Sequence, residues 1–212
     1  MDGAKRTRLM EAAMEEFAER GVELASYNKI IERSGLSKGT VYYYFDNKDS
    51  LLLTVLDEIC ERFGNAIGNL GLPKTKEEYW ETAWEYHSRV IRFFVENPLW
   101  GRVLFGLFKD VPWSEGYLEA FHDRTTRFLD DLIARGQEIG AVRGDFPPKT
   151  VQHLMHTVAK VLCADILGHY GLSGGEFPDG KQANMEKFMF MIHDLSRRIL
   201  TPEEDLICCR HF

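Results

Sequence analysis

The sequence predicts an all-α protein on three observations. Apolar residues recur at helical spacing along most of the 212-residue chain, polar joints containing glycine or proline separate these segments, and no stretch alternates as a β-strand does. Apolar residues make up 44% of the chain and charged residues 28%, which is ordinary for a globular protein with a sizeable core. We expect a small helical domain over residues 1–50 and a larger helical domain over residues 51–212.

The first predicted helix carries a buried stripe made of Leu9, Ala13 and Phe17. Gly21 ends this helix, and Ser26 starts a shorter one, because a serine hydroxyl can accept hydrogen bonds from the unpaired N–H groups of a helix's first turn. Gly35 ends the second helix in a tight turn, where glycine accepts the left-handed backbone conformation. This pattern is typical of the first half of a helix-turn-helix.

A third helix follows Ser37, which is again a good N-cap, and its first turn is Lys38, Gly39 and Thr40. In a helix-turn-helix this end of the helix reaches the base edges of DNA. Lys38 supplies positive charge, Gly39 lets the backbone approach a phosphate, and Thr40 offers a hydroxyl to a base or a phosphate. The first turn of this helix is therefore a candidate DNA contact.

Three consecutive tyrosines lie in this helix, Tyr42, Tyr43 and Tyr44, and Val41 and Phe45 beside them are expected to face the core. We expect Tyr42 and Tyr43 to point outward, where their hydroxyls can meet phosphates and their rings can contact a sugar or a thymine methyl. The alternative is a partly buried aromatic surface between helices. Lys48 at the head of the next helix favours DNA binding, because helix N-termini bind phosphate.

The N-terminal quarter of the chain resembles the TetR family of transcriptional regulators. The resemblance covers about the first 55 residues and rests on Phe17-Ala18-Glu19-Arg20-Gly21, Ser26, Ile30, residues 35–45 (GLSKGTVYYYF), Lys48-Asp49 and Leu52. By position in the motif, the family's DNA-contacting residues are Lys38, Gly39, Thr40, Tyr42, Tyr43 and Lys48, while Ser26 and Ser37 cap the two helices. The chain departs from the family pattern at Ile31 and Ser34, where alanine is usual.

The resemblance implies an all-helical homodimer with an N-terminal three-helix helix-turn-helix domain joined to a larger ligand-binding and dimerisation domain. It implies a palindromic double-stranded DNA operator, repression, release by a small effector, and no enzyme activity. We therefore expect no cofactor and no metal.

The net charge of −7 is unevenly distributed along the chain. Residues 1–50 contribute −1 and residues 51–212 contribute −6, so the N-terminal part is less acidic in total. Its positive side chains at Lys5, Arg6, Arg8, Lys29, Lys38 and Lys48 are placed where a phosphate backbone could pass. An acidic body discourages non-specific DNA binding, and specific binding should weaken steeply with salt.

The N-terminus lacks an apolar secretory core, and no run approaches the eighteen apolar residues of a membrane span, so we expect a cytoplasmic protein without a membrane partner. Four cysteines, Cys60, Cys163, Cys208 and Cys209, have no framework spacing and are expected to be reduced thiols. A redox sensor is the alternative.

The larger domain is predicted as helices separated by joints. Residues 48 to about 63 form a helix that leads out of the DNA-binding domain, and further breaks fall near residues 68–73, 97–98, 110–115, 143–148 and 171–180.

Aromatic residues are dense over residues 76–133. Most of them are explained as plain core, but together they exceed what packing needs and predict a pocket for a small apolar or aromatic effector. The predicted lining is Trp84, His87, Phe94, Phe105, Phe108, Tyr117 and Phe121.

Two later segments, residues 150–170 and 184–200, have apolar residues at helical spacing and predict a four-helix dimer interface. The predicted interface residues are Leu154, Val158, Leu162, Ile166, Phe188, Met191, Ile192 and Leu195. The alternative is that both helices close the core of a single chain.

Three other functions deserve comparison with this interpretation. His153, His156, Cys163 and His169 suggest a metal site, but no third ligand closes a tetrahedron at their spacing. An enzyme is disfavoured because no nucleophile elbow, phosphate-binding glycine loop or metalloprotease helix is present in the sequence. A DNA-binding regulator controlled by a protein partner, rather than by a small ligand, remains an alternative.

Overall fold

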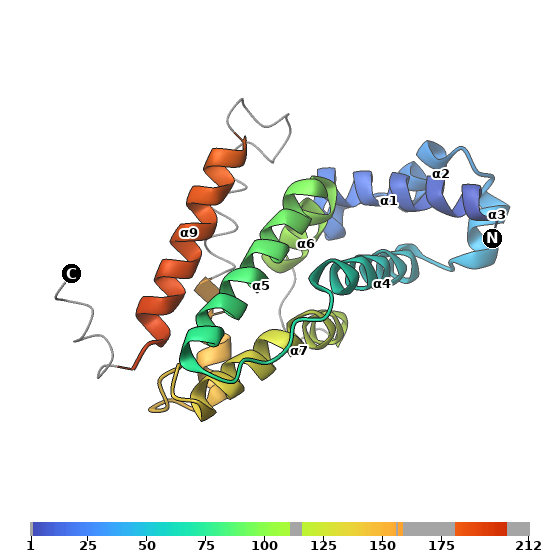
Figure 1. Ribbon diagram of the computed structural model, residues 1–212. Coiled ribbons are helices and arrows are strands. Elements are labelled where there is room, and N and C mark those ends of the chain that lie inside the picture. The colour runs from blue at the N-terminus through green and yellow to red at the C-terminus, as the bar shows by residue number, and fades with distance from the viewer. Residues whose placement is uncertain (1, 111–115, 156, 159–180, 203–212) are drawn as a thin grey trace. The chain divides into compact units, whose positions relative to one another are not determined.

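The computed structural model describes residues 2–110, 116–155, 157–158 and 181–202, except for the side chains at 105–106, 108–110, 116–126 and 181–188. All regular secondary structure in these residues is helical, which confirms the predicted fold class. The helices in chain order are α1 (Gly3–Leu24), α2 (Tyr27–Ser34), α3 (Lys38–Tyr44), α4 (Lys48–Ile67), α5 (Lys76–Glu96), α6 (Pro98–Asp110), α7 (Gly116–Glu138) and α9 (Lys181–Leu200) (Figure 1). Residues 148–155 and 157–158, between α7 and α9, are also helical.

The chain divides into two compact units. Unit 1 comprises residues 1–65 and 94–124, and unit 2 comprises residues 66–93 and 125–212. Residues 1–50 therefore lie within unit 1, which also includes most of α4 and the whole of α6.

Unit 1 is built around α1, which packs against α2 and α6. The predicted stripe is buried, with Leu9, Ala13 and Phe17 at most 1% exposed. The regular part of α1 ends at Gly21 as predicted, because this residue has φ 73° and the last turn continues only to Leu24. The α1 stripe thus supplies the surface on which the helix-turn-helix is built.

Unit 2 has its own core, to which α5, α7, the helical residues 148–155 and α9 contribute. Its buried members are Tyr79, Ala83, Leu132, Ile133, Ala141, Val142, Val151, Met155 and Leu200. The turn after α7 is closed by the backbone N–H groups of Ala141 and Val142, which donate to the Gly136 carbonyl at 2.8 and 3.0 Å. The Arg143 N–H donates to the Leu200 carbonyl at 2.7 Å and so joins this turn to the end of α9.

The predicted joints agree with the helix boundaries in the described part of the chain. Residues 68–75 separate α4 from α5, Asn97 separates α5 from α6, and residues 139–147 follow α7. The helix predicted to end near residue 63 continues to Ile67, which is buried, and Gly68 with φ 62° follows it. Residues 111–115 and 171–180 lie outside the described residues.

Candidate functional site

The start of α2 is tied to α1 by a buried carboxylate. The Ser26 hydroxyl accepts from the Lys29 N–H at 3.4 Å, as the sequence predicts, and the Ser26 N–H donates to Glu16 Oε1 at 3.1 Å. Glu16 is only 1% exposed, and its Oε2 lies 3.7 Å from Arg33 Nη1. Arg33 also donates to Glu19 Oε2 at 2.8 Å, and this contact lowers the pKa of the Glu19 carboxyl. These contacts fix α2 against α1.

The turn between α2 and α3 has the predicted left-handed glycine, with φ 66° at Gly35. Ile31 and Ser34, the two departures from the family pattern, are both 3% exposed. The Ser34 hydroxyl donates to the Ile31 carbonyl at 2.7 Å and accepts from the Leu36 N–H at 3.3 Å. The turn therefore satisfies the hydroxyl that replaces alanine.

The first turn of α3 presents its backbone outward. Ser37 caps it by accepting from the Thr40 N–H at 3.2 Å, and the two hydroxyls lie 2.8 Å apart. Lys38 and Gly39 are exposed, and a Cβ built on Gly39 would meet no atom of the chain within 4 Å. Gly39 is therefore not required by the packing of the chain itself.

The three tyrosines of α3 are exposed in the single chain. Tyr43 is 81% exposed, Tyr42 47% and Tyr44 46%, whereas Val41 is fully buried. Phe45 is half-buried and follows the helix as its C-cap. One face of α3 thus holds the helix in the core while the tyrosines are available to a partner.

Lys48 has a structural contact that the sequence analysis did not identify. Its Nζ donates to the carbonyls of Val22 at 2.7 Å and Glu23 at 2.9 Å. The last carbonyls of a helix lack partners within the helix, so a lysine ammonium stabilises them. The sequence offered one signal for this contact. The predicted end of α1 at Gly21 implies carbonyls near it that have no partner within the helix.

The other positive side chains of the DNA-binding segment differ in their surroundings. Arg6 donates to Glu58 Oε2 of α4 at 3.0 Å, so this side chain contributes to packing within unit 1. Lys5, Arg8, Lys29 and Lys38 are exposed. Exposed lysine and arginine side chains can approach a phosphate backbone without losing a contact within the chain.

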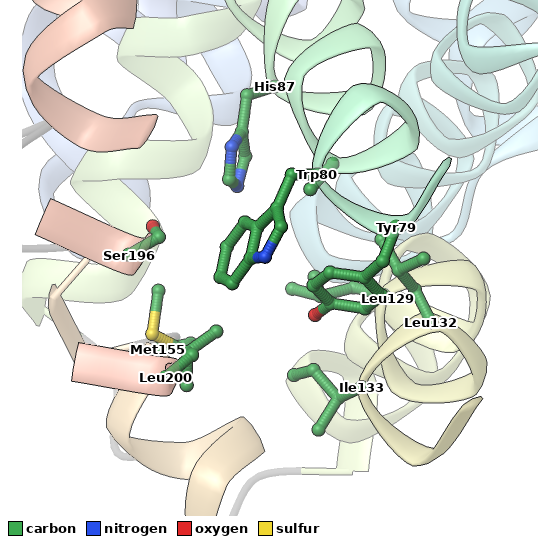
Figure 2. A pocket seen from close by; sticks show the side chains of 10 residues that line it. Tyr79, Trp80, His87, Leu129, Leu132, Ile133, Met155, Ser196 and Leu200 are labelled. Atoms are coloured by element: carbon green, nitrogen blue, oxygen red, sulfur yellow. The ribbon is translucent and has the colours of Figure 1, made fainter. Parts of the chain in front are cut away.

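A second candidate site is a cavity in unit 2, lined by Tyr79, Trp80, Ala83, His87, Leu129, Leu132, Ile133, Met155, Ser196 and Leu200. Figure 2 shows Trp80 and His87 from α5 pointing into the same space as Ser196 and Leu200 from α9. Its free volume is about 20 Å³, which is room for about one water. The lining is mainly apolar.

His87, which lines this cavity, and His193 near it both have an unsatisfied ring nitrogen. The ring centroids of His87 and His193 are 6.3 Å apart, and the Trp84 ring stands edge-on to His193 at 5.1 Å. Both Nδ1 atoms are buried, and no described group hydrogen-bonds to either. Burial, and secondarily the neighbouring His193, lowers the pKa of His87 to about 4, and burial also lowers the pKa of His193. His87 is therefore neutral at pH 7.

Comparison with known proteins agrees with the geometry of α1 to α4. Residues 9–55 match the family model described as bacterial regulatory proteins, tetR family. The chain is 31% identical over 158 residues to the HTH-type transcriptional repressor AcnR of Corynebacterium diphtheriae, covering 73% of this chain and 76% of the relative. The chain belongs to the TetR family. This family consists of transcriptional regulators rather than enzymes, so the chain is a DNA-binding transcription regulator.

Solved structures show the same fold over nearly the whole TetR-family chain. A putative tetR family regulator from Shewanella sp. PV-4 superposes with a TM-score of 0.74 at 17% identity, covering 94% of this chain and 99% of that one. FadR from Bacillus subtilis, in complex with stearoyl-CoA, gives a TM-score of 0.66 at 16% identity, covering 88% and 97%. The likeness extends beyond the family model into the C-terminal helices.

The predicted effector residues of this TetR-family chain are not all brought together. Trp84 and His87 lie beside His193 in unit 2, and His87 lines the cavity. Phe94 belongs to unit 1, where its ring centroid is 6.0 Å from that of Phe63. The side chains of Phe105, Phe108, Tyr117 and Phe121 lie outside the described residues. Sequence reasoning missed Trp80 and His193. No pattern in the sequence of α9 marks His193 as the neighbour of His87.

The predicted dimer residues fall into four groups. Leu154 and Met191 are each 47% exposed, and Val158 and Leu195 are half-buried. Ile192 is 7% exposed and lies in the interior of the chain itself. Leu162 and Ile166, and the side chain of Phe188, lie outside the described residues. Phe190, which the prediction did not include, is 66% exposed on α9.

The metal alternative and the expected absence of a membrane span concern residues that the structure describes only in part. Of the four residues considered as metal ligands, His153 is exposed, and His156, Cys163 and His169 lie outside the described residues. The described side chains hold no group of three or more potential metal ligands. None of the described helices combines the length and apolarity that a membrane span needs. Cys60 is buried, and the other three cysteines are outside the described residues.

Proposed function

We propose that this TetR-family regulator is a cytoplasmic repressor that binds a palindromic operator as a homodimer and releases it when a small apolar or aromatic effector binds unit 2. The observation that carries the DNA-binding part is the geometry of α2 and α3. Their capped N-termini, the open space at Gly39 and the exposed tyrosines support contacts to a phosphate backbone and to base edges.

In this proposal the DNA contacts are made by residues of three consecutive helices. Ser26, Ser37, Lys38, Gly39, Thr40, Tyr42, Tyr43 and Lys48 form the contact set. Lys48 retains a role near phosphate because its ammonium has three N–H groups and two of them are used on α1 carbonyls. Thr40 contributes through its hydroxyl, which is hydrogen-bonded to the Ser37 hydroxyl in the free chain.

A second copy of the chain would cover the exposed apolar side chains of unit 2. Leu154, Phe190 and Met191 are between 47% and 66% exposed, and large apolar groups with this exposure favour an interface. Two copies are needed to read two half-sites about one DNA turn, roughly 34 Å, apart. Sedimentation of the purified chain at micromolar concentration should therefore give a dimer, and Phe190→Glu should shift it towards monomer.

The effector site in this proposal is the cavity between α5, α7 and α9. Its apolar lining suits an apolar body, and the unsatisfied Nδ1 of His87 suits one polar group on the ligand. Because the free volume of about 20 Å³ is room for one water, the cavity must open to admit an effector. The complex of FadR from Bacillus subtilis with stearoyl-CoA supports the idea that this fold can bind a ligand with a long apolar chain.

The effector would act by binding an operator-releasing state more tightly than the operator-bound state. Such coupling is typically worth about 1–3 kcal/mol, or about 5- to 150-fold in affinity. We propose α4 as the mechanical link, because this one continuous helix starts at Lys48 and crosses from unit 1 into unit 2 between residues 65 and 66.

Control by a protein partner is the second candidate, and the small volume of the cavity is the observation that favours it. A panel of hydrophobic compounds distinguishes the two candidates by thermal unfolding. Our proposal predicts that at least one compound stabilises the wild type and loses its effect in His87→Leu. Stabilisation by none of the compounds would support the protein partner.

The regulator itself is tested by selecting bound sequences from a random duplex DNA pool with the purified full-length chain. We expect a palindrome whose half-sites are about one turn apart. Enrichment of no sequence by protein from which small molecules have been extracted would contradict operator binding.

A further inference from the structure

Tyr27, the first residue of α2, joins the start of α2 to the end of α3. Its hydroxyl donates to the Phe45 carbonyl at 2.6 Å. Its ring stands edge-to-face against Tyr42, with the ring centroids 5.4 Å apart and an interplanar angle of 82°. Tyr27 thus holds a residue that follows α3 and also contacts one of the exposed tyrosines within it.

The hydrogen bond from Tyr27 to Phe45 acts at the C-terminal end of α3. Phe45 is the C-cap of this helix, and its N–H donates to the Val41 carbonyl at 2.9 Å. Burial, followed by the neighbouring Tyr42 and Asp46, raises the pKa of Tyr27, so its phenol stays protonated and remains a donor at neutral pH. A seven-residue helix has few internal hydrogen bonds, so an outside donor at its C-terminal end limits fraying.

The ring contact is placed where it limits the freedom of Tyr42. About half of the Tyr42 side chain is covered, with 47% exposed, whereas Tyr43 is 81% exposed and pairs with Tyr44 at 4.9 Å. Perpendicular aromatic rings at this separation attract each other beyond their buried area. A side chain that is held before binding loses less conformational entropy when DNA arrives.

We propose that Tyr27 is a positioning residue for operator recognition, which acts by holding Tyr42 in the DNA-binding orientation, while the hydrogen bond to Phe45 fixes the Tyr27 ring against Tyr42. This inference rests on the proposed function, in which Tyr42 contacts DNA. It adds a residue that is itself half-buried and lies outside the predicted contact set. Tyr27 should therefore affect affinity through Tyr42 and not through a contact of its own.

The test is a double-mutant cycle measured by fluorescence anisotropy on the duplex selected from the random pool. Tyr27→Phe removes the hydrogen bond and keeps the ring, and we expect about threefold weaker binding. Tyr27→Leu removes both, and we expect about tenfold weaker binding. In the Tyr42→Ala background the same two changes should cost less than twofold, because the side chain that Tyr27 positions is gone.

Each outcome separates the inference from the function beneath it. Equal losses in both backgrounds, or no loss from Tyr27→Leu in the presence of Tyr42, would overturn the positioning role while leaving operator binding intact. Unchanged affinity in Tyr42→Ala would overturn both the Tyr42 contact and the inference. Tyr27→Phe is nearly isosteric and keeps the cycle informative if Tyr27→Leu unfolds, and circular dichroism shows which variants are folded.

Discussion

Gly39→Ala should stabilise the folded chain and weaken its binding to the operator. Gly39 is the second residue of α3, it is exposed, and a Cβ at this position meets no atom of the chain within 4 Å. Alanine is favoured over glycine in helices by about 0.5–1 kcal/mol. The free energy of unfolding should therefore rise by up to about 1 kcal/mol, which raises the melting temperature by about 1–4 °C for a chain of this size.

On DNA the added methyl group would occupy the space that a phosphate needs beside the α3 backbone. A hydrogen bond to a charged group is worth about 1.5–3 kcal/mol, so losing one such contact should weaken operator binding about tenfold to a hundredfold. Thermal unfolding followed by circular dichroism measures the first effect, and anisotropy titration on the selected duplex measures the second.

Gly64→Ala is the matched control. Gly64 lies in α4, it is exposed, and its Cβ would also meet nothing within 4 Å. This change should give a similar gain in stability with unchanged operator affinity. Wild-type affinity in Gly39→Ala, or the same loss of affinity in both variants, would refute the close approach of DNA at Gly39.

Three further changes test the packing around these sites. Lys48→Met should lower the free energy of unfolding by about 1–2 kcal/mol, since it removes both hydrogen bonds to α1 carbonyls; unchanged denaturant midpoints would contradict this. Gly136→Ala should cost about 1–3 kcal/mol in chemical denaturation, because its Cβ would overlap the Tyr79 ring and Val142, and a neutral result would mean that these side chains yield freely. His87 has a pKa of about 4 in the folded chain and an ordinary value of 6.5. Between these values the unfolded chain takes up a proton that the folded chain does not, so the stability that is present above pH 6.5 is lost as the pH falls to 4. Over that range the wild type should lose up to about 3 kcal/mol relative to His87→Leu in urea titrations, and parallel pH profiles would contradict the buried neutral imidazole.

The sequence predicted the parts of the DNA-binding surface that depend on local chemistry. The caps at Ser26 and Ser37 and the left-handed Gly35 occur where they were expected, because capping and turn formation involve residues within four positions of one another. The burial of Val41 and the exposure of Tyr43 follow from helical periodicity in the same way.

The sequence could not predict contacts between residues that are distant along the chain. The hydrogen bond from Tyr27 to Phe45 spans 18 positions and that from Lys48 to Val22 spans 26. The pairing of His87 with His193 spans more than a hundred positions, and only the packing of α5 against α9 creates it. Composition alone could not separate Phe94 from the cavity, because an aromatic residue in a core and one in a pocket have the same sequence signal.

The salt dependence of operator binding by the wild type and by Lys38→Ala shows whether α3 lies against the DNA backbone. Lys38 is exposed in the first turn of α3, where we propose that a phosphate lies. The wild type should lose affinity linearly in a plot of log affinity against log salt concentration, and Lys38→Ala should bind more weakly with the slope reduced by about 1. Identical slopes and affinities for the two proteins would show that α3 does not lie against the DNA backbone.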